Sequence, residues 1–514
     1  MLADILARLQ KQASTGESGV AAAFELNWQS LESEAQKLAC LVSLFALAPI
    51  PWSMVESAAS ASLMEFDLKA NCTILVERYL LQQLADDTYQ VHERIQELLR
   101  QKLEELAQAD ELKCGYCQAM VAVAKDIPQT PTLIEIAQAT LSIPHLAEVV
   151  TVYQAWLSDE DLISPFEGLV RFYAGQGAYE QALPWGKQSL LATKERLGKE
   201  HPDVATSLNN LAVLYELQGR YSEAEPLCIQ ALAMRKRLLG DEHLDVASSL
   251  NNLAKLYKSQ GRDSEAEPLY IEALAMRKRL LGDEQPDVAE SLDNLALLYE
   301  LQGRYSEAEP LCIEALAMRK RLLGDEHLDV ASSLNNLAAL YDSQKRYSKA
   351  EPLYIEALAM TKRLLGDEHP DVATSLDNLA VLYELQGRYS EAEPLCIQAL
   401  AVRKRLLGDE HPDVASSLNN LALLYYSQGR YSEAEPLYIE ALAMKKRLLG
   451  DEHRYVATSL NNLAKLYKSQ GRYNDAEPLY IEALAIAEKQ LGANHPNTIT
   501  ICENLEDLRR NRQP

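Results

Sequence analysis

Several common signatures are missing from the 514-residue sequence, and each absence excludes a class of protein. No run of about 18 apolar residues occurs, so we expect no membrane-spanning helix. The first residues lack the basic start and long apolar stretch of a secretion signal. Lys and Arg number 50 against 75 Asp and Glu, a net charge of −25, which argues against a nucleic-acid-binding surface. We therefore expect a cytoplasmic protein without a membrane or nucleic-acid partner.

Chemistry-bearing motifs are also scarce. Eight cysteines in a chain of this length do not make a small-domain disulfide framework. Cys114 and Cys117 form an isolated C-x-x-C, without two further ligands for zinc and in a stretch with helical rather than thioredoxin-like spacing. No phosphate-binding G-x-x-x-x-G-K-[ST] motif is present, and residues 16–19 (GESG) lack both its spacing and its Lys. We expect no enzyme activity, no cofactor and no metal.

A 42-residue sequence, however, repeats almost unchanged along most of the chain. Seven repeats fill residues 204–497, and each opens on a valine: Val204, Val246, Val288, Val330, Val372, Val414 and Val456. A degenerate copy precedes them at residues 162–203, and a half repeat follows at residues 498–514. Repetition at this period is typical of a solenoid in which each repeat packs on its neighbours.

Each repeat predicts two antiparallel helices, which we call helix A and helix B. In the first repeat, Leu208, Leu211, Ala212 and Tyr215 fall on one stripe of helix A. Gly219 follows, where a left-handed residue can end the helix.

Helix B contains several further signals in its sequence. Ser222 and Glu225 have the spacing of a capping box. The basic residues 235–237 fall in its last turns, where cations meet the negative end of the helix dipole, and Gly240 ends it. In the "GDEHPD" type of loop that follows, we interpret the aspartate at the Asp203 position as a helix N-cap and not as a metal ligand.

The repeat resembles a tetratricopeptide repeat of the kinesin-light-chain type. The resemblance is carried by the small residues Ala212, Ala224 and Ala231, by Tyr215, and by the pattern "LNNLA…LY…QGRYSEAEPL…AL". It covers residues 162–514 and implies a right-handed α-solenoid with a concave groove that binds proteins or peptides. A kinesin light chain also has a heptad coiled coil ahead of its repeats, and the first ~160 residues show no sustained heptads.

A row of asparagines is the first candidate for contact with a ligand. The face of helix A opposite its core stripe lines the groove in arrays of this class, and one position on it is Asn in all seven repeats: Asn210, Asn252, Asn294, Asn336, Asn378, Asn420 and Asn462. An amide can both donate and accept, so the row could hold the backbone of an extended peptide, as the matching asparagines do in the resembled family. The alternatives are passive duplication, or bonds between adjacent helices.

A two-repeat pattern on the same face is the second candidate. Apolar residues recur every 84 residues as Val213 and Leu217, Leu297 and Leu301, and Val381 and Leu385. The intervening repeats place more polar pairs there, such as Lys255 and Ser259. Duplication of a two-repeat block explains the origin of the pattern. Its consequence is a groove with apolar surface at alternate repeats, suited to a ligand with matching apolar anchors.

The first 160 residues have a different texture. Helical spacing over residues 35–48 and 53–59, a helix over 68–84, a turn at Asp86-Asp87, a short strand over 89–91 and a helix from Glu93 predict a winged-helix-like domain. The segment from Phe24 to Leu103 resembles the winged-helix part of STAND (NB-ARC) signalling ATPases, whose nucleotide-binding core is missing here.

Within that resemblance, Val91-His92-Glu93 matches the motif whose histidine senses nucleotide phosphates. With no nucleotide core in the chain, we favour a role for His92 in orienting the strand and the helix. The helix predicted over 68–84 offers only Lys69 and Arg78 as bases, too few for binding DNA.

We therefore predict an all-α chain, a right-handed α-solenoid of tetratricopeptide hairpins with a small, mostly helical, winged-helix-like domain at its N-terminus. The predicted divisions are a winged-helix-like domain (1–110), a helical connector (111–161), the degenerate repeat (162–203), seven repeats (204–497) and a capping helix (498–514). The first hypothesis for function is a non-enzymatic scaffold that binds a peptide or partner protein. The second is the sensor half of a split or truncated STAND switch, whose N-terminal domain docks an NTPase core. The third is a kinesin-light-chain-like cargo adaptor.

Overall fold

The computed structural model describes residues 16–85 and 87–511, and these residues form two compact parts. The N-terminal module comprises residues 16–172 with 191–196, and the array comprises residues 173–190 with 197–511. The division passes through α10 (Ser164–Ala174) and α11 (Tyr179–Arg196), the two helices of the degenerate repeat. Nearly all the secondary structure in the described residues is helical, which confirms the predicted all-α class.

A small antiparallel sheet lies among the helices of the N-terminal module. Its strands are β1 (Ile50–Pro51), β2 (Gln82–Ala85) and β3 (Thr88–Gln90), in the order β1-β3-β2. The helices are α2 (Gly16–Gln29), α3 (Ser33–Ser43), α4 (Trp52–Ala61), α5 (Leu68–Glu77) and α6 (Glu93–Glu105). The core contains Leu38, Leu41 and Phe45, all fully buried. Along the chain, strand β1 comes between α3 and α4, and the β2–β3 hairpin comes between α5 and α6.

The helix predicted over residues 68–84 is wrong at its C-terminal end. Helix α5 ends at Glu77, Tyr79 adopts a left-handed backbone with φ 58°, and β2 follows. Pairing with β3 satisfies the backbone groups along one side of β2, and sequence periodicity alone does not reveal that partner.

The elements predicted after that helix lie close to their expected places. The strand expected over 89–91 is β3, one residue earlier, and the helix expected from Glu93 is α6. Of the expected turn, Asp87 has a positive φ of 50°, whereas Asp86 lies outside the described residues.

Three helices continue the N-terminal module: α7 (Ala109–Asp126), α8 (Leu133–Ala139) and α9 (Ile143–Thr151). Among the described residues, one stretch, Leu133–Thr151, is long and apolar enough to cross a membrane, with 19 residues and a mean hydropathy of 1.2. It is built from α8, a 3-10 turn and α9, and its His145 packs against the core. The His145 ring accepts from the backbone of Ala46 at 3.1 Å and lies 3.1 Å from the carbonyl oxygen of Pro49. These contacts favour a core segment over a membrane span.

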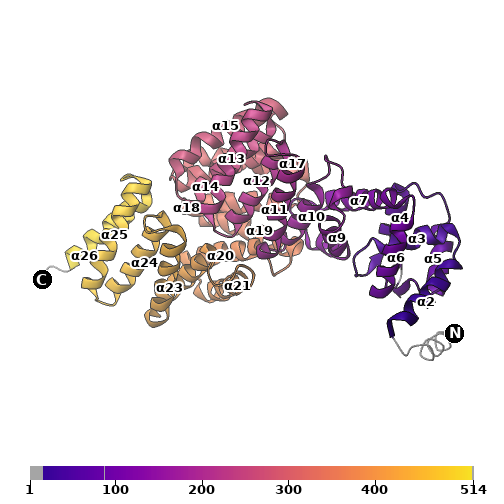
Figure 1. Cartoon of the computed structure of the whole chain (residues 1–514). Helices are drawn as coiled ribbons and strands as arrows, with labels where there is room; N and C mark the ends of the chain where they lie inside the picture. Colours follow the sequence, from indigo (N-terminus) through magenta and orange to yellow (C-terminus); the bar gives the residue numbers. More distant parts are fainter. Residues whose placement is uncertain (1–15, 86, 512–514) are drawn as a thin grey trace. The chain divides into compact units, whose positions relative to one another are not determined.

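The array follows as a series of helical hairpins (Figure 1). The pairs are α12 (Pro202–Leu217) and α13 (Tyr221–Leu239), α14 (Leu244–Ser259) and α15 (Asp263–Leu281), α16 (Pro286–Leu301) and α17 (Tyr305–Leu323), α18 (Leu328–Ser343) and α19 (Tyr347–Leu365), α20 (Pro370–Leu385) and α21 (Tyr389–Leu407), α22 (Pro412–Ser427) and α23 (Tyr431–Leu449), and α24 (Arg454–Ser469) and α25 (Tyr473–Leu491). The last helix, α26 (Pro496–Asn511), occupies the place of the expected cap, of which residues 512–514 lie outside the described chain.

Buried small residues let the two helices of a repeat approach closely. Ala212 on helix A and Ala224 and Ala231 on helix B are at most 1% exposed. Leu208, also fully buried, fills the layer between neighbouring repeats. Because each repeat buries its apolar stripe only with the help of its neighbours, the stack is stable as a whole rather than repeat by repeat.

Charged side chains add a second set of contacts between repeats. Arg262 lies 3.9 Å from the ring centroid of Tyr257, pairs with Glu265 of its own helix at 2.8 Å, and reaches Glu225 of the preceding repeat at 2.6 Å. The same arrangement recurs at the matching arginines of later repeats.

Two local details differ from the sequence predictions, and a third was not predicted. Helix B begins at Tyr221 without a side-chain cap, and Glu225 bonds to the next repeat, so the capping box is wrong. The N-cap of helix A is His201, whose Nδ1 accepts from the backbone of Asp203 at 3.3 Å. Arg235, one of the basic residues near the end of helix B, is 5% exposed and donates to the carbonyl of Asp245 in the next repeat at 3.0 Å.

Successive turns of the array touch along one edge. In four consecutive repeats, a histidine Nε2 lies 2.7 to 3.0 Å from the backbone oxygen of the residue 194 positions earlier. The pairs are His369 with Gly175, His411 with Leu217, His453 with Ser259, and His495 with Leu301. Since 194 residues span between four and five repeats, the array completes one superhelical turn within that length.

Candidate ligand-binding surface of the array

The candidate surface lies on the A helices, and we call it the inner face. We define it by the positions that correspond to Val213, Glu216 and Leu217 in each repeat. Lys258 in α14, at the position of Glu216, and Arg454, at the contact between turns, both lower the pKa of Glu300 in α16, which burial raises.

The predicted asparagine row lies on this side, but its amides are used within the array. Asn252 donates from Nδ2 to Asn209 at 3.2 Å, and Asn294 donates to Asn251 at 3.1 Å. Asn462, which is 8% exposed, donates to Asn419 at 3.3 Å in the same way.

The other members of the row are half-buried. Asn336 bonds to Asp293, and Asn210, Asn378 and Asn420 lie at equivalent places on their helices. Bonds between adjacent helices, the alternative considered from sequence, therefore account for at least four of the seven. A contact of this row with a bound peptide stays a prediction.

The six predicted apolar residues keep part of their surface accessible. Val213, Leu217, Leu297, Leu301 and Val381 are half-buried, and Leu385 is 49% exposed. Two of them also lie at the contact between turns, where the backbone oxygens of Leu217 and Leu301 meet His411 and His495. Leu385 has no such contact described, which agrees with its larger exposure.

A set of bonds that the sequence reasoning missed explains how the two-repeat pattern is held. The serine of three polar repeats donates to a glutamate of the preceding repeat: Ser259 to Glu216 at 3.4 Å, Ser343 to Glu300, and Ser427 to Glu384. The glutamate stands next to the apolar residue of its own helix. In the last repeat, Ser469 instead lies 3.1 Å from the hydroxyl of Tyr426. The signal was present in the sequence, because Glu and Ser alternate with the same 84-residue period as the leucines.

Burial on the inner face changes several pKa values. Burial, with the neighbouring charges of Glu300 and Glu384, raises the pKa of Asp342 to about 6. Burial lowers the pKa of Lys258 to about 8, and the charge of Lys255 adds to that effect. The inner face is therefore a region where charges are incompletely solvated and respond to one another.

An ion pair locks the contact between turns at one place. Arg454 lies at the start of α24, where other repeats carry Pro or Leu, and Asp263 begins α15, where other repeats carry Tyr. The guanidinium donates to the Asp263 carboxylate at 2.5 Å and to the carbonyl of Lys258 at 2.8 Å. The two residues are 5% and 8% exposed. Two departures from the repeated sequence, 191 residues apart, thus meet in space.

The histidine loops take part in this edge rather than in a metal site. The Nδ1 of His411 accepts from the backbone of Asp413 at 3.1 Å, so the hydrogen is on Nε2, which faces Leu217. Within residues 16–85 and 87–511, no group of three or more His, Cys, Asp or Glu side chains is arranged to hold a metal ion.

In the N-terminal module, the motif residues His92 and Cys117 make contacts that support the fold. His92 is the N-cap of α6, and its Nδ1 accepts from the backbone of Arg94 at 3.3 Å. Cys117 is buried in α7, where its thiol lies 3.5 Å from the carbonyl of Tyr153, and burial raises its pKa to about 12. That thiol is protonated at neutral pH, which disfavours redox chemistry.

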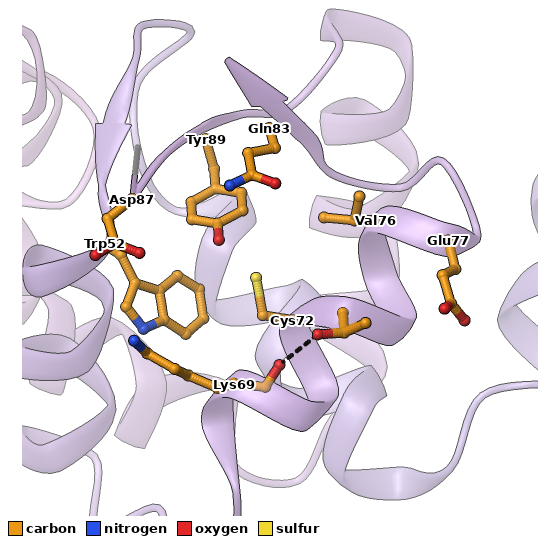
Figure 2. Close-up of a pocket in the computed structure, with 9 residues that line it drawn as sticks. Trp52, Lys69, Cys72, Val76, Glu77, Gln83, Asp87 and Tyr89 are labelled. Carbon is orange, nitrogen blue, oxygen red and sulfur yellow. Dashed lines mark hydrogen bonds between the residues drawn. The ribbon is translucent and has the colours of Figure 1, made fainter. Parts of the chain in front are cut away.

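A small cavity of about 180 Å³ lies between α5 and the β2–β3 hairpin (Figure 2). Trp52 and Tyr89 form one wall, with their rings 5.3 Å apart, and Lys69 and Cys72 of α5 form another. The cavity mixes a cation, carboxylates and aromatic rings, so its lining does not select one class of ligand.

The tetratricopeptide repeat model matches the chain in overlapping stretches that run without a gap from residue 161 to residue 512, more than half of the chain. The chain belongs to the tetratricopeptide repeat family. The degenerate repeat and the last helix of this tetratricopeptide repeat protein are included in the match. No similar protein was found among curated proteins.

Several solved structures are similar to this tetratricopeptide repeat protein. A STAND (signal transduction ATPase with numerous domains) protein with a tetratricopeptide repeat sensor, from Pyrococcus horikoshii, matches over 94% of this chain and 66% of its own, with 15% identity and a TM-score of 0.55. A Rap protein in complex with competence and sporulation factor matches over 75% of this chain and 99% of its own, with 13% identity and a TM-score of 0.53. A putative kinesin light chain with nearly identical repeats, from Podosopora anserina, is 30% identical over 40% of this chain and 98% of its own, with a TM-score of 0.32.

Proposed function

We propose that this protein is a non-enzymatic cytoplasmic scaffold that binds an extended peptide or a segment of a partner protein on the inner face of its array. The Rap protein of similar fold was solved with competence and sporulation factor, and that complex supports capture of a ligand by such an array. The proposal needs no cofactor, and the surface itself supplies the recognition.

One observation carries the proposal. The inner face presents a partly accessible apolar side chain beside a carboxylate at every second repeat, and the carboxylate is oriented by a serine of the next repeat. An array that only needed to be stable would gain by burying or pairing these groups fully. Their regular, incomplete burial favours a surface that is completed by a ligand.

A matched pair of variants tests this function. Leu301→Lys together with Leu385→Lys places two charges on the inner face. Ile313→Lys together with Ile397→Lys makes the same chemical change on helix B, where these isoleucines are 47% and 48% exposed. We expect the inner pair to abolish recovery of a partner from a lysate of the source cell and the outer pair to preserve it. Equal recovery by both would contradict the proposal.

A second candidate function is the sensor half of a STAND-type switch. The fold shared with the Pyrococcus horikoshii STAND protein extends over 94% of this chain and supports this reading. The order of elements in the N-terminal module, α3-β1-α4-α5 followed by the β2–β3 hairpin, supports a winged-helix-like domain over residues 1–110 that docks an NTPase core. Affinity purification of the full chain, with a P-loop protein as the main partner, would decide for this candidate.

A kinesin-light-chain-like cargo adaptor stays the third prediction. A kinesin heavy chain in the same purification would be required for it, and its absence would remove this candidate.

A further inference from the structure

The contact between successive turns of the array is built from two kinds of edge. The loop edge is the start of helix A, where a residue that is usually histidine precedes the first helical residue. The glycine edge is the end of helix A, with a glycine two residues later. At one such contact, His411 lies 3.0 Å from the backbone oxygen of Leu217, and Pro412 lies on Gly219.

Glycines without side chains make this contact possible. A Cβ added to three of them would lie only 2.6 to 3.0 Å from a proline ring of the next turn. The pairs are Gly177 with Pro370, Gly219 with Pro412, and Gly303 with Pro496. At the fourth contact, Arg454 takes the place of proline, and its Cγ would lie 3.8 Å from a Cβ added at Gly261. A side chain at the glycine positions would therefore hold the two turns apart.

The glycine edge of three later repeats is exposed. Gly387, Gly429 and Gly471 have the same left-handed backbone, with φ of 74°, 75° and 76°, and a Cβ added to any of them would meet nothing within 4 Å. All three are exposed, whereas the equivalent Gly219 is buried at the contact between turns. Leu385, at the end of its helix A, is 49% exposed. Three adjacent repeats thus present this edge to solvent.

The loop edge of the first repeats is accessible as well. The side chains of His201 and His243 are 40% and 43% exposed, against 8% for His411. In all three, Nδ1 accepts from the backbone of the residue two positions later, at 3.1 to 3.3 Å. The hydrogen is therefore on Nε2. For His201 and His243, no acceptor of that hydrogen is described within residues 16–85 and 87–511.

We propose that copies of this chain associate head to tail, with the loop edge of one copy on the glycine edge of another. Continuity with the contact inside the array carries this inference, because each copy presents both halves of an interface that it already uses between its own turns. The inference does not depend on ligand binding at the inner face. A heterologous contact of this kind leaves one edge free at each end, so further copies can add.

The residue Lys345 sets the register of the association. It replaces glycine two residues after α18, and its side chain would meet an incoming loop. The glycines of the next three repeats are then available to three adjacent loops. The expected pairs are His201-Pro202 on Leu385-Gly387, His243-Leu244 on Ser427-Gly429, and Gln285-Pro286 on Ser469-Gly471. In this register no glycine of the edge is left for Leu328, which begins the fourth helix A.

Sedimentation velocity of the full chain at several concentrations tests the association. We expect monomer at about 1 μM and dimer with larger species at about 100 μM, as for a small, transient interface. Leu244→Lys and Leu328→Lys form a matched pair, because both leucines are half-buried and begin a helix A within the same local sequence. We expect the first substitution to weaken the association about tenfold and the second to leave it unchanged.

A variant of the glycine edge tests the other half of the interface. Gly429→Lys introduces a residue that the array already accepts, since Lys345 has a φ of 58° at the equivalent position. Gly408→Lys is its control, because Gly408 is also exposed with a φ of 79° but lies at the end of a helix B. We expect Gly429→Lys to weaken the association as Leu244→Lys does, and Gly408→Lys to preserve it.

A mixture of the two edge variants tests the head-to-tail geometry. Leu244→Lys and Gly429→Lys should each sediment as a monomer, whereas an equal mixture should form a dimer and nothing larger, since each chain supplies the edge that the other lacks. The altered edges both carry lysine and do not attract one another. Formation of that dimer also shows that both variant chains are folded, and circular dichroism checks each chain alone.

Three results would overturn the inference. A wild-type chain that stays a monomer at every concentration leaves both edges to solvent or to a different partner, so the second copy would be wrong. Equal effects of Leu244→Lys and Leu328→Lys would refute the loop edge as the docking surface. An association that stops at a dimer and that neither edge variant weakens would indicate an isologous interface elsewhere on the chain.

Discussion

The Arg454–Asp263 pair predicts a specific double-mutant cycle. Arg454→Leu restores a residue that other repeats carry and leaves Asp263 buried without its partner, and Asp263→Tyr does the reverse. With 5% and 8% exposure and a 2.5 Å contact, the pair is desolvated on both sides. Breaking a pair of this kind typically destabilises a protein by about 3–5 kcal/mol, because a charge remains buried and unpaired. The double variant removes both charges and returns both positions to the common repeat sequence.

We therefore expect each single variant to lower the free energy of unfolding by about 3 kcal/mol, and the double variant to lower it by less than about 1 kcal/mol. The coupling energy is then large compared with the error of urea unfolding followed by circular dichroism. Small-angle X-ray scattering adds a second readout, because only the single variants should open the contact between turns and raise the radius of gyration. Additive effects of the two substitutions, with unchanged scattering, would refute a lock between turns.

Three further predictions concern the same array. Gly219→Ala should destabilise the protein more than Gly387→Ala. Both glycines have a positive φ, of 70° and 74°, but of the two only the Cβ added at Gly219 would meet Pro412, at 2.6 Å. Equal shifts in thermal midpoint would contradict this. Burial lowers the pKa of His453 to about 4, so its neutral ring should stabilise the fold fully above pH 6.5. That contribution should be lost as the pH falls from 6.5 toward 4. The His453→Gln variant should therefore show a flatter pH dependence of the unfolding midpoint over this window. Tyr270→Phe should leave the unfolding midpoint unchanged or raise it, since the buried hydroxyl has no partner among the described residues, and a loss above about 1 kcal/mol would show an unrecognised bond.

The repeat itself was predictable because its helices depend on residues close together in the sequence, and the same pattern recurs seven times. The spacing of Leu208, Leu211, Ala212 and Tyr215 predicts helix A, and Gly219 ends it with the expected positive φ of 70°. The same reasoning fails where an element depends on a partner that its own local sequence does not reveal. The helix predicted through residues 68–84 ends at Glu77, because β2 finds a strand partner in β3.

Sequence reasoning likewise predicted one part of the candidate site and missed another. The accessibility of the leucines at alternate repeats follows from helical periodicity, and the structure leaves them half-buried or exposed as that periodicity requires. The use of Asn252 and Asn294 between helices does not follow, because one face of one helix cannot reveal what the neighbouring helix offers. The same limit hid the serine donors of Glu300 and Glu384.

The sequence by itself determined the hairpins, their number and their apolar stripe, since helix formation and nearest-neighbour packing depend on residues within about one repeat. Only the tertiary structure decided how the stack coils and closes on itself. The contact of His453 and Arg454 with residues 191 to 196 positions earlier depends on the small rotation between repeats, accumulated over four or five of them. This rotation is set by how whole helices pack against one another, and a local sequence pattern does not predict it.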